Sequence, residues 1–291
     1  FLYFFANFCI IFCSFFSLFS SSKMSQEELL LSFQDETALD WFVRLAHPSL
    51  SFRSGHAELD ALNAIVPGEL VEIVGRESSG KLQLAMTLVA EFLLCESKAA
   101  QHRAVVLDFN GSFRTERLMQ ILVNKRPQLE ENESAIIGHL DRVYYARVSL
   151  AEEFEQCLAE LKQMVAVLRF VPFIIVNKVG AMLHNLFDDN NTDDGQRQLK
   201  QILATLKELC ASHGATVVTI NHLVDWRGYP TPALGNAWIK GISHRIFLHR
   251  QNNDNAETNG RTEFSALILS EKVPSGKFRF SLTNRGFDSN L

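Results

Sequence analysis

The chain has 291 residues, of which 47% are hydrophobic and 21% charged, and its 28 basic and 33 acidic side chains give a formal net charge of −5. This composition excludes a wholly disordered chain, a collagen and a coiled-coil rod. The mild acidic balance excludes nucleic-acid binding by bulk charge alone and leaves room only for a local basic patch. The five cysteines contain no C-x-x-C pair, so neither a disulfide framework nor a zinc knuckle is indicated.

The first residues differ from the remainder. Residues 1–22 carry no charge and form a run long enough for a membrane-spanning helix, but without the basic start of a signal peptide. Met24 is the first methionine, and residues 14–22 contain only Ser, Phe and Leu, which pyrimidine-only codons can encode. We interpret residues 1–23 as translated non-coding sequence ahead of a start at Met24. A membrane anchor is the alternative interpretation.

From residue 24 onward the pattern is that of an α/β protein. Residues 24–51 form a short helical segment that His47-Pro48 ends. Near-continuous apolar runs then alternate with amphipathic stretches, which predicts a mainly parallel sheet with helices on both faces. The predicted strands are 69–74, 103–109, 142–148, 172–177 and 215–220, and the predicted helices are 80–97, 114–126, 150–169 and 195–212. Runs of strand character with polar turns between them predict an antiparallel C-terminal extension at 244–249, 264–270 and 277–282.

The segment GRESSGKL matches the phosphate-loop pattern G-x-x-x-x-G-K between a predicted strand and a predicted helix, which is the context that such a loop requires. Its glycines let backbone N–H groups turn toward a phosphate, and the helix N-terminus adds positive potential. An ordinary glycine turn is the alternative. The predicted nucleotide-binding residues are Gly75, Arg76, Glu77, Ser78, Ser79, Gly80, Lys81 and Leu82.

Three positions near this loop lack the groups that serve magnesium and water. Leu82 stands where the motif has a Ser or Thr whose hydroxyl binds the ion. Asn177 ends a strand where an ATPase has an Asp that orients the ion, and Asn110 follows a strand where a carboxylate would activate water. These positions predict weak or absent Mg2+ binding and weak or absent hydrolysis. Lys178 either supplies part of the missing positive charge or is a surface lysine on the opposite face of its strand.

Four longer motifs carry a family resemblance: SGHAELDALN with PGELVEIVGRESSGKLQL within 54–84, LDFNGSFRTERLMQIL (107–122), VVTINH (217–222) and PALGNAWIKGISHRIFL (232–248). They resemble motifs of the RecA-type recombinases. The last, which is the most specific, resembles a segment of the paralogues of the eukaryotic strand-exchange recombinase (the Rad-fifty-one family), closest to the D-type paralogue. The resemblance implies a RecA-like ATPase core over 52–291 that binds ATP, works in the nucleus in homologous recombination and DNA repair, and joins sister paralogues in a hetero-oligomer on single-stranded DNA, not on a membrane.

The resemblance also assigns roles by position. Asn110 takes the place of the catalytic carboxylate, Asn177 that of the magnesium-orienting Asp, and His222 that of the side chain that senses the γ-phosphate. Of the two loops that contact DNA in the family, 179–196 contains four Asp and no Lys or Arg, which makes it a poor surface for phosphate. The second loop, 224–235, and the segment after it supply the predicted DNA-binding residues Trp226, Arg227, Tyr229, Lys240 and Arg245.

Alternatives remain for both the loop and the function. Trp226 and Tyr229 either stack on bases or pack the loop onto the domain. The protein is either a nucleotide-binding scaffold with weak or lost hydrolysis, or an active DNA-dependent ATPase completed by a partner subunit at a composite site. A small-molecule kinase is disfavoured because the sequence shows no substrate-lid pattern. Residues 24–68 contain no F-x-x-A polymerisation motif, which argues against homopolymers.

Overall fold

The computed structural model describes residues 53–66, 68–95, 102–168, 171–183, 192–251, 263–270 and 275–288. All of them belong to one compact unit, Pro48–Leu291. The interpretations of residues 1–23 and 24–51 lie outside the described residues. Within the described ranges, none of the helices has the length and apolar character needed to cross a membrane.

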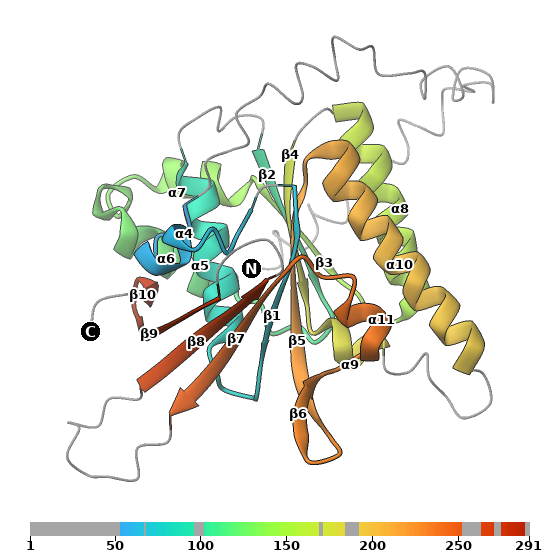
Figure 1. The fold of residues 1–291 in the computed structure, drawn as a ribbon. Coiled ribbons are helices and arrows are strands. Elements are labelled where there is room, and N and C mark those ends of the chain that lie inside the picture. Colours follow the sequence, from blue (N-terminus) through green and yellow to red (C-terminus); the bar gives the residue numbers. More distant parts are fainter. Residues whose placement is uncertain are drawn as a thin grey trace, which may run out of the picture. The chain divides into compact units, whose positions relative to one another are not determined.

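A sheet of ten strands runs through the described part of the unit (Figure 1). Its order is β10-β9-β8-β7-β1-β5-β4-β2-β3, and β6 pairs with β5 outside this path. Strands β1 to β5 and β7 pair in parallel, and β7 to β10 pair in antiparallel fashion. The strands are β1 Leu70–Gly75, β2 His102–Asp108, β3 Val143–Arg147, β4 Val171–Asn177, β5 Thr216–Trp226, β6 Tyr229–Pro232, β7 His244–Gln251, β8 Glu263–Ser270, β9 Gly276–Thr283 and β10 Gly286–Asp288.

Helices cover both faces of this sheet, as Figure 1 shows. In β4, Phe173 and Ile175 pack on the side of α5 and α6, whereas Ile174 and Val176 pack on the side of α8 and α10. Because successive strand residues point to opposite faces, a strand covered twice needs an almost unbroken apolar run. The helices are α4 Ala57–Ala61, α5 Lys81–Leu94, α6 Thr115–Lys125, the 3-10 turn η2 Pro127–Leu129, α7 Glu133–Leu140, α8 Ala151–Leu168, α9 Val179–Leu183, α10 Thr192–His213 and α11 Gly235–Ile239.

The predicted fold class is confirmed, and the predicted strands and helices are present with shifted ends. The largest shift is in β5, which was predicted to end at residue 220 and continues to Trp226. The short elements α4, α7, α9, α11, β6 and β10 were not predicted. The predicted first DNA loop, 179–196, instead begins with α9 and ends within α10, and residues 184–191 lie outside the described part.

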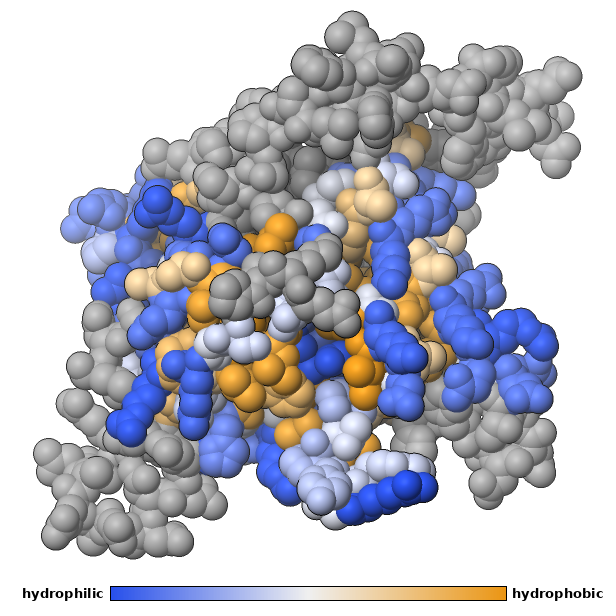
Figure 2. Space-filling model, in the orientation of Figure 1, coloured by the Kyte–Doolittle hydropathy of each residue, from blue (hydrophilic) through white to orange (hydrophobic). Residues whose placement is uncertain are grey.

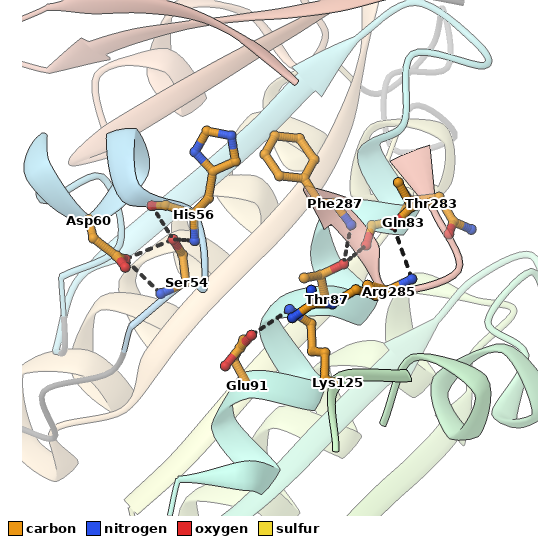
Figure 3. A network of polar contacts seen from close by, with 10 residues as sticks. All are labelled: Ser54, His56, Asp60, Gln83, Thr87, Glu91, Lys125, Thr283, Arg285 and Phe287. Atoms are coloured by element: carbon orange, nitrogen blue, oxygen red, sulfur yellow. Dashed lines mark hydrogen bonds and ion pairs between the residues drawn. The ribbon is translucent and has the colours of Figure 1, made fainter. Parts of the chain in front are cut away.

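The C-terminal strand β10 is hydrogen-bonded to helix α5, which begins at the end of the phosphate loop (Figure 3). The Thr87 hydroxyl accepts a hydrogen bond from the Phe287 backbone N–H at 2.8 Å and donates to the Gln83 carbonyl at 2.7 Å. A Cβ at Gly286 would collide with the same hydroxyl, so the approach of β10 requires glycine at a φ of +94°. Strand β10 therefore stabilises the position of helix α5, which follows the phosphate loop.

Candidate nucleotide site

The predicted phosphate loop lies between the end of β1 and the start of α5. Gly80 precedes α5 with a left-handed φ of +89°, and Ser78 also has a positive φ of +57°. A Cβ at Gly75 would collide with the Leu248 carbonyl oxygen and the Ser79 Oγ. The loop can therefore close this tightly only with glycine at position 75.

The inner surface of the loop fits a phosphate group. Ser79 Oγ is buried and has no hydrogen-bond partner among the described residues. It precedes the 14-residue helix α5, whose first turn contains no acidic side chain and whose N-terminal N–H groups have no partner within the helix. An anion at the start of α5 would satisfy these N–H groups. The triphosphate of a nucleotide is such an anion.

Lys81 is folded back onto the loop. Its Nζ donates to the Gly75 carbonyl at 2.8 Å and to the Arg76 carbonyl at 2.6 Å. Burial, assisted by the positive charge of Lys178 and opposed by Glu77, lowers the pKa of Lys81 from 10.5 to about 8. A bound phosphate would offer this ammonium a negative partner in place of two neutral carbonyls.

Nucleotide affinity is therefore expected to fall as the pH rises above about 8. The lowered pKa of Lys81, about 8, leaves its amine increasingly neutral above that pH, whereas phosphate binding requires the charged form. The dissociation constant should rise by about tenfold per pH unit above the pKa. Equilibrium titration with a fluorescent ATP analogue from about pH 7 to about pH 9.5 tests this, with far-UV circular dichroism at each pH as the control for folding. An affinity that is constant over this range would contradict the assignment.

The residues predicted to replace the catalytic and magnesium-binding groups gather where β2 and β4 end. Asn177 Nδ2 lies 2.8 Å from Asp108 Oδ1, 2.8 Å from Ser112 Oγ and 3.2 Å from Asn110 Oδ1. The carboxylate of Asp108 is fully buried and also accepts from the Phe113 backbone N–H at 2.8 Å. The amide of Asn177 thus occupies the centre of this cluster as a hydrogen-bond donor.

This cluster does not fit magnesium. The ion requires oxygen ligands in near-octahedral geometry. At the centre of this cluster, the side chain of Asn177 presents an N–H group instead of an oxygen. Leu82 has no oxygen on its side chain and packs, partly buried, against the apolar core beside α5. Within the described ranges, no group of three or more His, Cys, Asp or Glu side chains could hold a metal ion. Asn110, predicted to take the place of the catalytic carboxylate, is exposed, and an amide cannot act as a general base.

The strand β5 brings His222 to the phosphate loop. His222 is directly opposite Gly75 in the parallel pairing of β1 and β5. Its backbone N–H donates to Asn221 Oδ1 at 2.8 Å, and its carbonyl accepts from Ala233 at 3.1 Å. These bonds fix the backbone at the predicted sensor position beside the first residue of the loop, and the imidazole Nδ1 lies near Gly180 of α9.

Sequence reasoning missed a buried carboxylate beneath the loop. Glu72 Oε1 accepts from Trp238 Nε1 at 2.7 Å and from Asn221 Nδ2 at 2.8 Å, and Oε2 accepts from Arg245 Nε at 2.5 Å. The Glu72 side chain is fully buried and that of Arg245 is 12% exposed. Arg245, predicted to contact DNA, is thus placed in an internal ion pair, whereas Lys240 is exposed at the end of α11. The sequence signal that could have revealed this ion pair is the charged Glu72 within the otherwise apolar run LVEIV.

The second predicted DNA loop is a β-hairpin that extends beyond the sheet (Figure 1). Arg227 and Gly228 form its two-residue turn with φ values of +52° and +82°, as in a type I′ turn. Trp226 and Tyr229 pair directly opposite each other and are 64% and 75% exposed. They do not pack the loop onto the domain, so that alternative is wrong.

The hairpin tip combines aromatic and positive character. Directly opposed strand residues share a face, so the rings of Trp226 and Tyr229 lie on one side of the tip. The Arg227 guanidinium carbon lies 5.8 Å from the centre of the Trp226 ring. At the base of the tip, Asp225 forms an exposed ion pair with Arg76 of the phosphate loop at 3.2 Å. In Figure 2 the hairpin, at the bottom of the view, is mainly hydrophilic, unlike the apolar surface above it.

Comparison with known proteins agrees with this geometry. RAD51-like protein 1 from Caenorhabditis briggsae is 31% identical over 227 residues, covering 77% of this chain and 85% of that protein. DNA repair protein RAD51 homolog 4 from Mus musculus is 28% identical, with 72% of this chain and 64% of that protein covered. DNA repair protein RAD51 homolog 1 from Arabidopsis thaliana is 27% identical, with coverage of 81% and 68%. The model of the family described as Rad51 matches residues 48–289, and the chain therefore belongs to the Rad51 family.

Proposed function

We propose that the protein is a nucleotide-binding Rad51 paralogue, closest to the D-type, that assists the strand-exchange recombinase on single-stranded DNA during repair by homologous recombination. Membership of the Rad51 family supports a role in recombinational DNA repair. The observation that supports this proposal is a phosphate loop with Lys81 folded onto it, near Leu82, Asn177 and Asn110, which stand where the family resemblance places magnesium-binding and catalytic groups. We place the protein in the nucleus, in a hetero-oligomer with sister paralogues.

The alternative is an ATPase that a partner subunit completes at a composite site. The two functions differ in turnover. ATP hydrolysis measured on the purified chain and on its complex with a co-purified sister paralogue, each with single-stranded DNA, separates them. Turnover that stays near background in both samples supports the scaffold. Turnover that appears only in the complex, and disappears with Lys81→Ala in this chain, supports the composite ATPase.

Restoring the two magnesium-binding side chains is expected to create metal-dependent binding. In Leu82→Thr with Asn177→Asp, the new carboxylate lies beside buried Asp108, where two negative charges repel unless a cation joins them. We expect Mg2+ to strengthen nucleotide binding by the double variant by about tenfold or more, measured as the ratio of affinities with and without the ion.

The matched control is Leu82→Val with Asn177→Asp, because Val has the shape of Thr without its hydroxyl. Its magnesium dependence should be weaker than that of the Thr variant. If the Thr variant gains no magnesium dependence at all, the positional assignment of Leu82 and Asn177 is wrong.

The hairpin tip is expected to carry single-strand binding. Trp226→Ala removes a stacking surface worth about 1–3 kcal/mol per base, and Arg227→Ala should reduce the dependence of log affinity on log salt by about one phosphate contact. Fluorescence anisotropy with a labelled oligothymidine at several salt concentrations measures both effects. Lys200→Ala, which removes an exposed cation from α10, is the control. An Arg227→Ala variant with unchanged affinity and salt slope would remove the tip from the DNA-binding surface.

A further inference from the structure

The end of β4 presents a second cation near the phosphate loop. Lys178 follows Asn177 directly and has a left-handed backbone φ of +61°, which is uncommon for a lysine. Its carbonyl accepts from the Ala181 backbone N–H at 3.1 Å, so the residue leads into α9 in a defined turn. Its side chain is exposed. An unfavourable backbone conformation that the surroundings maintain is a reason to ask what the side chain does.

The turn that contains Lys178 packs against the strand that neighbours the loop. A Cβ at Gly180 would collide with Asn221 Oδ1 and would lie 3.0 Å from His222 Nδ1. His222 is in turn directly opposite Gly75, the first residue of the loop. Consistent with this placement, the charge of Lys178 contributes to the lowered pKa of Lys81. The turn that contains Lys178 therefore packs beside the residue that pairs with the start of the loop, at a site whose other side chains do not fit magnesium.

We propose that Lys178 is a second phosphate-binding residue, which supplies the positive charge that a divalent metal would otherwise provide, so that the site takes a metal-free nucleoside triphosphate. The inference rests on the nucleotide binding proposed above. A triphosphate bound between Lys81 and Lys178 would give each ammonium group a negatively charged partner. An ammonium group is a compact point charge with rotatable donors, and it needs no octahedral set of oxygen ligands.

The test is titration of the full chain with a fluorescent ATP analogue, once in excess EDTA and once in Mg2+. We expect the wild-type affinities in the two conditions to agree within about threefold, and Lys178→Gln to bind about tenfold more weakly in EDTA, the effect of losing one charged contact. Lys178→Arg should stay within about threefold of wild type because it keeps the charge. Lys200→Gln on α10 should change nothing.

A variant that also suits the backbone protects this test against misfolding. Lys178→Gly accepts the left-handed conformation without strain and removes the ammonium, so it should fold normally and show the same tenfold loss as Lys178→Gln. Wild-type binding that EDTA abolishes, or Lys178→Gln and Lys178→Gly variants that bind within twofold of wild type, would overturn the role of Lys178. Failure of the wild-type chain to bind in either condition would instead overturn the proposed nucleotide binding.

Discussion

Replacing Glu72 by Ala is expected to lower the free energy of unfolding by about 3–5 kcal/mol, which is a large part of the stability of a typical domain. The substitution leaves three donors without their shared acceptor: the Trp238 indole N–H, the Asn221 amide and the largely buried Arg245 guanidinium. An uncompensated buried cation costs more than the pair contributed when intact. Urea unfolding followed by far-UV circular dichroism measures the loss.

The matched control is Glu208→Ala, which breaks an ion pair of similar length at the surface. Glu208 lies 2.7 Å from Lys162, with side chains 49% and 32% exposed. Water already solvates both groups, so this change should cost less than about 1 kcal/mol. Equal, small effects of the two substitutions would contradict the view that Glu72 organises the sheet beneath the phosphate loop.

Replacing Lys81 by Ala is expected to weaken nucleotide binding by about a hundredfold or more, because it removes a cation that is folded onto the loop in a partly buried site. The same change should alter the free energy of unfolding by no more than about 1 kcal/mol, since the bonds that Nζ makes to described residues are two hydrogen bonds to neutral loop carbonyls. Binding and urea unfolding should be measured on the same preparation.

Lys162→Ala on α8 is the control, because it also removes one lysine, in this case from a surface ion pair with Glu208. A Lys81→Ala variant that is folded and binds nucleotide as the control does would place the nucleotide elsewhere. A loss of binding that accompanies unfolding would leave the Lys81→Met variant, which keeps the apolar stem without the charge, as the measurement that decides. A folded variant that has lost binding supports the loop, and a folded variant that binds as the control does contradicts it.

The sheet and the phosphate loop could be predicted from the sequence because both are encoded locally. Strands such as β4 are apolar on both faces, and the loop occupies consecutive residues between a strand and a helix. Helices α9 and α11 have five residues each, which is too short for a 3.6-residue period to be visible. The extension of β5 to Trp226 depends on its pairing with β6. That pairing requires a turn with Arg227 at a positive φ, and arginine is not a residue that indicates such a turn in a sequence.

The parts of the site that could not be predicted depend on contacts between distant segments. The partners of Glu72 come from separate elements. Asn221 and Arg245 lie on β5 and β7, the two neighbours of β1 in the sheet, and Trp238 lies on α11. The same holds for Asn177, whose amide reaches Asp108 because β4 lies beside β2. The motif positions predicted that magnesium-binding and catalytic side chains are missing. The hydrogen bonds that Asn177 makes with Asp108, Asn110 and Ser112 at these positions could be seen only in the structure.

The most direct measurement is isothermal titration calorimetry of the purified chain with ATP in the presence of EDTA. Binding in the phosphate loop without a divalent metal predicts saturable binding of one nucleotide per chain, lost in the Lys81→Ala variant. No saturable binding of ATP in EDTA, or binding that Lys81→Ala leaves intact, would contradict the account.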